Sequence, residues 1–322
     1  MRDFPMLELE WPEGDRLKSF REQASSDRAE HFKTHLLRRI STPKWETRDT
    51  GIPLLADPKL VAAQELLKWG GRSLNDIDTF AFETRPGSST KFIGVAARKG
   101  GRPNAYLIYF RHSARATDYP GGAGLLSLGI GDYFMGRLQI CPQLAASTAN
   151  VAVILPIAVG SSGEFESNAQ FVAQCLKEIQ AELFGGSDGP LLLAAYSDGI
   201  FRLNSFFKNC RSLMGKVLAV YDFDGSYRRG AESITLADTK ARVFRYDGAN
   251  AVPSLPHESV SLYLARTMAM NPARVPLMMR VQGKQSFDRW KEFARSINDT
   301  DDLHSYIPSC MLHHGLDMTP GV

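Results

Sequence analysis

A chain of 322 residues is long enough for one large α/β domain or two small ones, and its 43% apolar and 23% charged residues are typical of a globular protein. The net charge of +3, without a block of Lys and Arg interleaved with aromatic residues, argues against nucleic acid as a partner. The N-terminal residues contain no uninterrupted apolar segment typical of a secretory signal, and no stretch approaches the roughly 18 apolar residues of a membrane span.

The cysteines give a prediction about the compartment. The four cysteines are Cys141, Cys175, Cys210 and Cys310; they lie far apart and have no Cys-x-x-Cys spacing. This pattern predicts reduced, mostly buried thiols and no metal site. We therefore expect a cytoplasmic protein.

Residues 1–75 show no alternation of strands and helices, and we expect them to form a helical N-terminal extension. Residues 15–39 are charged and carry apolar residues at helical spacing, which predicts one or two amphipathic helices. A further helix is expected from Asp57 to Trp69, with Gly70-Gly71 as its stop. The chain is thus divided into this extension and a main domain at 76–322.

From residue 77 onward the pattern predicts strands that alternate with helices. A hairpin is expected from the β-rich stretches 78–83 and 91–97, which are joined by Arg85-Pro-Gly-Ser-Ser. Further strands are expected at 104–110, 149–157, 191–195, 216–221, 241–246 and 275–281, and helices at 165–183, 200–210, 256–268, 287–297 and 306–314. This order predicts a mostly parallel sheet with helices on both faces and an antiparallel edge.

The most informative stretch is 189–199, Gly-Pro-Leu-Leu-Leu-Ala-Ala-Tyr-Ser-Asp-Gly. An apolar strand ends abruptly at Ser197, and a helix follows. Ala195 and Gly199 are small, as a sharp turn requires when it brings a strand and a helix close together. The stretch resembles the nucleophile elbow of the α/β-hydrolase superfamily, with Ala195 in place of the first glycine of Gly-x-Ser-x-Gly. A plain Ser-Asp-Gly turn is the alternative.

The resemblance implies an α/β-hydrolase fold over about residues 77–322, with Ser197 as a nucleophile. A serine hydroxyl needs a base, an acid that orients the base, and donors for the oxyanion. The family order is Ser, acid, His. The acid then falls at Asp247, after the 241–246 strand, with Asp222 or Asp224 after the preceding strand as alternatives.

For the base, the resemblance implies His304, in the loop that leads into the last expected helix. An apparent helix separates His304 from the strand at 275–281, so the family position would have to contain an insertion. His313 and His314 lie near the expected end of the last helix, where the helix dipole stabilises a cation and Gly315 can cap. Their position is explained without catalysis, and His304 is preferred.

The implied oxyanion donors are the N–H of Asp198 and an N–H in the loop after the 104–110 strand. His112 and Ser113 open that loop, which resembles the His-Gly start of lipase and esterase oxyanion loops. The loop continues into a glycine-rich stretch at 119–136. This stretch is expected either to line or cover an acyl pocket, or to pack on the sheet.

The sequence therefore predicts a serine hydrolase that acts on carboxylic esters through an acyl-enzyme on Ser197. A thioesterase, an amidase or an acyltransferase with the same triad is an alternative, as is a non-catalytic binding protein that has kept the fold. The expected partner is a small ester or acyl compound, and no cofactor is implied. The oligomeric state is not specified by the sequence.

Overall fold

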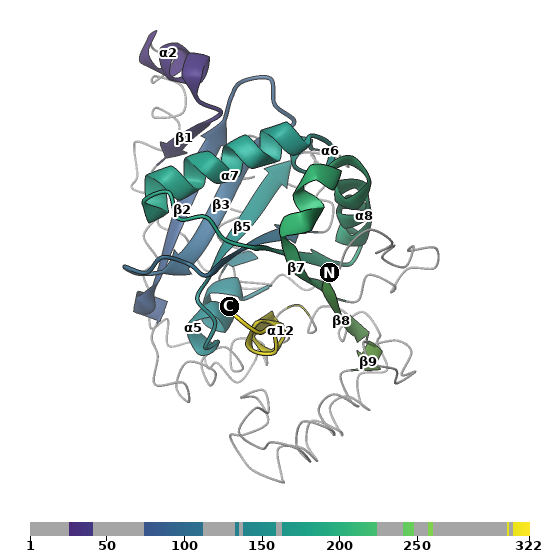
Figure 1. Cartoon of the computed structure of the whole chain (residues 1–322). Helices are drawn as coiled ribbons and strands as arrows, with labels where there is room; N and C mark the ends of the chain where they lie inside the picture. Colours follow the sequence, from purple (N-terminus) through teal and green to yellow (C-terminus); the bar gives the residue numbers. More distant parts are fainter. Residues whose placement is uncertain are drawn as a thin grey trace, which may run out of the picture.

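The computed structural model describes residues 26–40, 74–111, 133–134, 138–158, 163–223, 241–247, 257–259, 308 and 312–322. A 9-stranded sheet forms the centre of this part of the chain (Figure 1). Its strands are β1 (Leu37–Ile40), β2 (Ile77–Thr84), β3 (Thr90–Arg98), β4 (Ala105–Phe110), β5 (Val151–Ala158), β6 (Leu191–Tyr196), β7 (Val217–Phe223), β8 (Arg242–Asp247) and β9 (His257–Ser259).

The strand order is β1-β2-β3-β5-β4-β6-β7-β8-β9. Strands β1, β2 and β3 pair antiparallel, and β3 pairs antiparallel with β5. From β5 through β4, β6, β7 and β8 to β9 every pairing is parallel. An opening hairpin, the exchange of β4 and β5, and a parallel run beyond them make up the α/β-hydrolase fold. The expected fold class is confirmed.

Helices cover both faces of the sheet. On one face, α7 (Ala169–Phe184) and α8 (Gly199–Asn209) bury Val172, Ile179 and Leu203 against it. On the other, α5 (Ile140–Ala146) and α12 (Leu312–Asp317) contribute to a core that contains Leu144, Leu312 and Leu316 (Figure 1). The strands between these layers read as continuous apolar runs because both of their faces are buried; β4, β5 and β6 are buried at every position.

The expected helix at 165–183 is two helices, α6 (Glu164–Ser167) and α7. The break falls at Asn168, whose backbone is extended and whose side chain accepts a hydrogen bond from the Phe171 N–H at 3.0 Å. A side-chain cap of this kind starts a new helix by satisfying one of its free N–H groups. Two short 3-10 helices, η2 (Leu74–Asp76) and η4 (Arg211–Lys216), precede β2 and β7.

The expectation of helix up to residue 39 is wrong at its end. Helix α2 covers Ser26–Thr34, but the chain then forms strand β1, which pairs with β2. The carboxylate of Glu178 on α7 accepts the N–H groups of Leu36 and Leu37 at 2.8–3.1 Å. Buried Glu83 on β2 pairs with Arg28 and Arg38. These tertiary contacts override the helical pattern of the sequence.

Two expectations nearer the C-terminus are also corrected. Residues 257–259 lie within an expected helix but form strand β9 on the edge of β8, because strand pairing there outweighs a local helical pattern. Gly315 does not end the last helix, since α12 continues to Asp317. The rest of the expected helix at 256–268 and the expected elements at 275–281 and 287–297 lie outside the described residues.

Cys141, Cys175 and Cys210 are free thiols and buried, as expected; Cys310 lies outside the described residues. Burial raises the pKa of all three, that of Cys210 to about 11. None of them is therefore a thiolate nucleophile at neutral pH. In the described part of the chain, no helix is long and apolar enough to cross a membrane.

Candidate active site

Ser197 lies at the tip of a sharp turn between β6 and α8. Its backbone is left-handed, with φ of 55°, a conformation that costs a residue with a side chain free energy. The turn is held by two hydrogen bonds: Ser197 N–H donates to the Phe223 carbonyl at the end of β7, and Ile200 N–H donates to the Ser197 carbonyl, each at 3.2 Å. Ser197 is half-buried. The surrounding structure therefore fixes a strained serine at the carboxyl edge of the sheet.

The two small residues beside Ser197 have different roles. A Cβ placed on Gly199 would lie 2.3 Å from the carbonyl oxygen of Phe110 and 3.0 Å from that of Arg111, so the start of α8 rests directly on the end of β4. Ala195 is fully buried in the same core as α8, so this turn accommodates its methyl group. The alanine that departs from the family pattern is thus compatible with the elbow, whereas position 199 requires glycine.

Asp198 is the N-cap residue of α8, with φ of −67° and ψ of −4°. Its backbone N–H follows Ser197 directly and belongs to the start of an 11-residue helix. Helix N-termini present free N–H groups and a partial positive charge. This is the environment that a developing oxyanion requires, and the Asp198 N–H stays our predicted donor.

Strand pairing gives the positions of two of the three candidate acids relative to Ser197. Tyr196, Phe223 and Tyr246 pair across β6, β7 and β8, so they form one row. Asp247, the last residue of β8, follows that row by one residue, as Ser197 does. Asp222 precedes the row and is buried within the sheet at 7% exposure. Asp224 lies outside the described residues.

The candidate bases are less completely described. His304 lies outside the described residues, as do His112 and Ser113. His313 lies in α12 and is buried, and its backbone N–H donates to Gln143 Oε1 at 3.3 Å. The last helix does not end at His313 and His314 as expected, because α12 continues through Gly315 to Asp317.

The far end of the glycine-rich loop packs on the sheet. Tyr133 and Phe134 are fully buried. A Cβ on Gly94 of β3 would lie 3.1 Å from the Phe134 ring, and the Arg111 guanidinium lies 5.7 Å from the centre of the Tyr133 ring. These two residues fit the packing alternative. Residues 119–132, 135 and 136 lie outside the described part of the chain.

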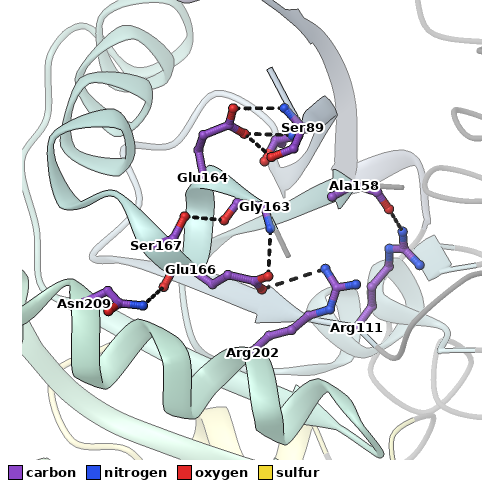
Figure 2. A network of polar contacts seen from close by, with 10 residues as sticks. Ser89, Arg111, Ala158, Gly163, Glu164, Glu166, Ser167, Arg202 and Asn209 are labelled. Carbon is purple, nitrogen blue, oxygen red and sulfur yellow. Dashed lines mark hydrogen bonds and ion pairs between the residues drawn. The ribbon is translucent and has the colours of Figure 1, made fainter. Parts of the chain in front are cut away.

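Buried charged residues gather near the start of α8, the helix that follows Ser197: Arg202 on α8, Glu166 on α6, and Arg111 after β4 (Figure 2). Arg111, which follows β4, donates to the Ala158 carbonyl at the end of β5 at 2.6 Å. Arg202 on α8 pairs with Glu166 on α6 at 3.8 Å, and their side chains are 6% and 4% exposed. Burial raises the pKa of Glu166 although Arg202, the Gly163 N–H and Arg111 act to lower it. Burial lowers the pKa of Arg202, because it disfavours the charged form of either group.

Sequence reasoning missed these three residues. The available signals were a charge on an inward-facing helix position, between Phe201 and Leu203, and an arginine directly after the fully apolar strand β4. Either signal is also consistent with an exposed residue. Only the fold brings the three together, since Glu166 and Arg202 belong to different helices.

No family model matches the sequence, and no curated protein matches it. Among solved structures, the chain is similar to an S-formylglutathione hydrolase from Agrobacterium tumefaciens, with 10% identity and a TM-score of 0.34 over 72% of this chain and 96% of that one. It is similar to the rice cell wall degrading esterase LipA from Xanthomonas oryzae, with 12% identity and a TM-score of 0.32 over 49% of this chain.

The chain spans 45% of that Xanthomonas esterase. It is also similar to a hyperthermophilic esterase from the archaeon Pyrobaculum calidifontis, with 14% identity and a TM-score of 0.28 over 53% of this chain and 55% of that one. At these scores the likenesses add nothing to the fold, which the strand order establishes by itself.

Proposed function

We propose that this chain, which has the α/β-hydrolase fold, is a serine hydrolase that acts on carboxylic esters through an acyl-enzyme on Ser197. The observation that carries the proposal is the left-handed backbone of Ser197 at the turn between β6 and α8. A strained residue that the surrounding structure holds in place is typical of an active site. A nucleophile elbow needs this conformation to present its hydroxyl above the sheet edge.

In the proposed reaction, Ser197 Oγ attacks the ester carbonyl carbon while His304 takes the hydroxyl proton. The tetrahedral oxyanion accepts a hydrogen bond from the Asp198 N–H, next to the positive end of α8. The C–O bond to the alcohol then breaks, and His304 gives the proton to the leaving oxygen. Water repeats the sequence on the acyl-enzyme and releases the acid.

For the orienting acid we propose Asp247. Its support is the register: Asp247 and Ser197 each stand one residue beyond the same row of paired residues, two strands apart, which is roughly 10 Å at the usual spacing. An imidazole can bridge two residues at that separation. Asp222 lies one residue before that row and is buried in the sheet.

The test is covalent labelling of the purified chain with a fluorophosphonate, measured by intact mass, beside Ser197→Ala. We expect one adduct on the wild type and none on the variant. Hydrolysis of p-nitrophenyl acetate should show a burst of p-nitrophenol equal to the enzyme concentration, because the acyl-enzyme accumulates. A folded wild type that gains no adduct and shows no burst would contradict the proposal and favour a binding protein.

Further variants separate the members of the proposed triad. We expect Asp247→Asn to lower kcat on the order of 10⁴-fold, as when an orienting acid is removed, and Asp222→Asn to leave it nearly unchanged. We expect His304→Ala to abolish the burst, whereas His35→Ala, at an exposed position just before the edge strand β1, should not. Matched thioester and anilide substrates would identify a thioesterase or an amidase.

A further inference from the structure

The buried pair of Arg202 and Glu166 joins α8, the helix that begins two residues after Ser197, to α6. Arg202 lies on the first turns of α8, and Glu166 lies on α6; Figure 2 shows the two side chains directed at each other. Glu166 Oε1 also accepts the Gly163 N–H at 2.7 Å. Asn209 at the end of α8 donates to the Glu166 carbonyl at 3.3 Å. The pair is therefore held from both helices.

Other charged or titratable groups face Arg202 from each neighbouring element. Asp198 lies four residues before Arg202 at the start of α8 and attracts its guanidinium. Arg111 faces both Arg202 and Glu166 from the end of β4, and Tyr133 faces Arg202 from the loop before α5. Two cations and two carboxylates thus form one group, and one of the carboxylates belongs to the neighbour of Ser197.

We propose that Arg202 is a positioning residue of this hydrolase. Its guanidinium offsets the negative charges of Glu166 and Asp198 and thereby sets the electrostatic potential at Ser197 and its base. The inference depends on the function proposed above. It adds a residue that does not touch the substrate and acts on the base through space.

The physical reason lies in the burial of the pair. Water does not screen a charge whose side chain is only 4–6% exposed as it screens a surface charge. At an effective dielectric constant of about 20, a unit charge about 10 Å away shifts a pKa by about one unit. Loss of the Arg202 cation stabilises a protonated base and raises its pKa, and loss of the Glu166 anion does the opposite.

The experiment measures the rate of fluorophosphonate labelling from pH 5 to 9 and takes the pH at which the acidic limb reaches half its plateau. We expect Arg202→Met to move this midpoint upward by about half to one pH unit and Glu166→Gln to move it downward by a similar amount. The double variant E166Q/R202M should return to within a few tenths of the wild-type midpoint. Arg202→Lys, which keeps the charge, should do the same.

Removing one partner of a buried pair is strongly destabilising, because the other charge is left unpaired. The comparison of Glu166→Gln with E166Q/R202M therefore serves as the control, since it removes the charge at position 202 without leaving Glu166 as an unpaired anion. We expect the midpoint of the double variant to lie above that of Glu166→Gln. If the midpoint does not rise, or if both single variants lower the plateau without moving the midpoint, Arg202 only packs and the inference is wrong. A wild type that is not labelled at any pH would instead contradict the proposed function.

Discussion

Gly199 stands so close to Phe110 that a side chain cannot be placed between them: a Cβ on Gly199 would lie 2.3 Å from the Phe110 carbonyl oxygen. Because that oxygen belongs to the backbone of a central strand, it cannot rotate away. We expect Gly199→Ala to force α8 off the sheet, to lower the free energy of unfolding by about 3 kcal/mol, and to abolish labelling of Ser197. Urea denaturation and intact mass measure the two effects.

Gly215 provides the matched control. It lies in η4, its φ is not positive, and a Cβ there would have no atom within 4 Å. We expect Gly215→Ala to change the free energy of unfolding by less than about 1 kcal/mol and to keep the labelling rate. Equal effects of the two substitutions would show that the contact with β4 does not require glycine at position 199.

The strain at Ser197 predicts a separation of stability from activity. A left-handed backbone costs a residue with a Cβ about 1 kcal/mol and costs glycine almost nothing. We expect both Ser197→Ala and Ser197→Gly to lose labelling, but Ser197→Gly to be about 1 kcal/mol more stable than Ser197→Ala in urea denaturation. If the two variants unfold at the same urea concentration, the turn relaxes and stores no strain.

The elbow and the sheet were predictable from the sequence because their signals are local. Continuous apolar stretches such as Leu191–Tyr196 predict strands buried on both faces, and small residues around Ser197 predict a tight turn. The row that brings Ser197 and Asp247 level follows from strand pairing, and the sequence predicts only that both lie at strand ends.

The parts that sequence reasoning missed depend on partners far away in the chain. Strand β1 forms because Glu178 accepts the Leu37 N–H from 141 residues away and Glu83 pairs with Arg38. Strand β9 exists only as a neighbour of β8. Glu166 and Arg202 can be buried only because α6 and α8 pack together and bring the two opposite charges into contact. No local pattern contains these contacts.

Gln143 connects the C-terminal segment to α5, and its loss should release that segment. The side chain is fully buried: Nε2 donates to the carbonyls of Leu138 and Pro308 at 2.8 and 2.9 Å, and Oε1 accepts the N–H groups of Leu312 and His313. Because Gln143→Leu leaves these buried groups unpaired, we expect a loss of about 3 kcal/mol in urea denaturation. Hydrogen exchange should increase in residues 312–322.

Two further variants test the same connection. Gln174 is exposed and makes one hydrogen bond, to Glu178 at 2.8 Å, so we expect Gln174→Leu to cost less than about 1 kcal/mol. Gln143→Glu keeps the acceptor for α12 but places a carboxylate against two carbonyl oxygens. Its stability deficit should shrink as the pH falls and the carboxyl becomes protonated. A deficit that does not depend on pH would contradict the assigned donors.

The pH dependence of stability should show the contribution of Glu164 on α6. Burial acts to raise the pKa of this carboxyl, but the N–H of Thr90 and the hydroxyl and N–H of Ser89, at 2.8–2.9 Å, outweigh it and lower the pKa below 4.5 (Figure 2). A lowered pKa in the folded state contributes stability above the unfolded value, and this is lost as the pH falls through the folded value. We expect Glu164→Gln to cost about 1–2 kcal/mol at pH 7, with a deficit that shrinks below about pH 4.5.

Glu182→Gln separates this effect from the simple removal of a carboxylate. The Glu182 side chain is 51% exposed and pairs with Arg39 at 3.6 Å on the surface of the same molecule, so its loss should cost less than about 1 kcal/mol at pH 7. Urea denaturation of the wild type and both variants from pH 7 to pH 4 measures the two deficits. The assignment is wrong if Glu164→Gln costs no more than Glu182→Gln at pH 7. It is also wrong if its deficit stays constant down to pH 4, because the bonds from Ser89 and Thr90 favour the ionised carboxylate and must weaken when a proton binds to it.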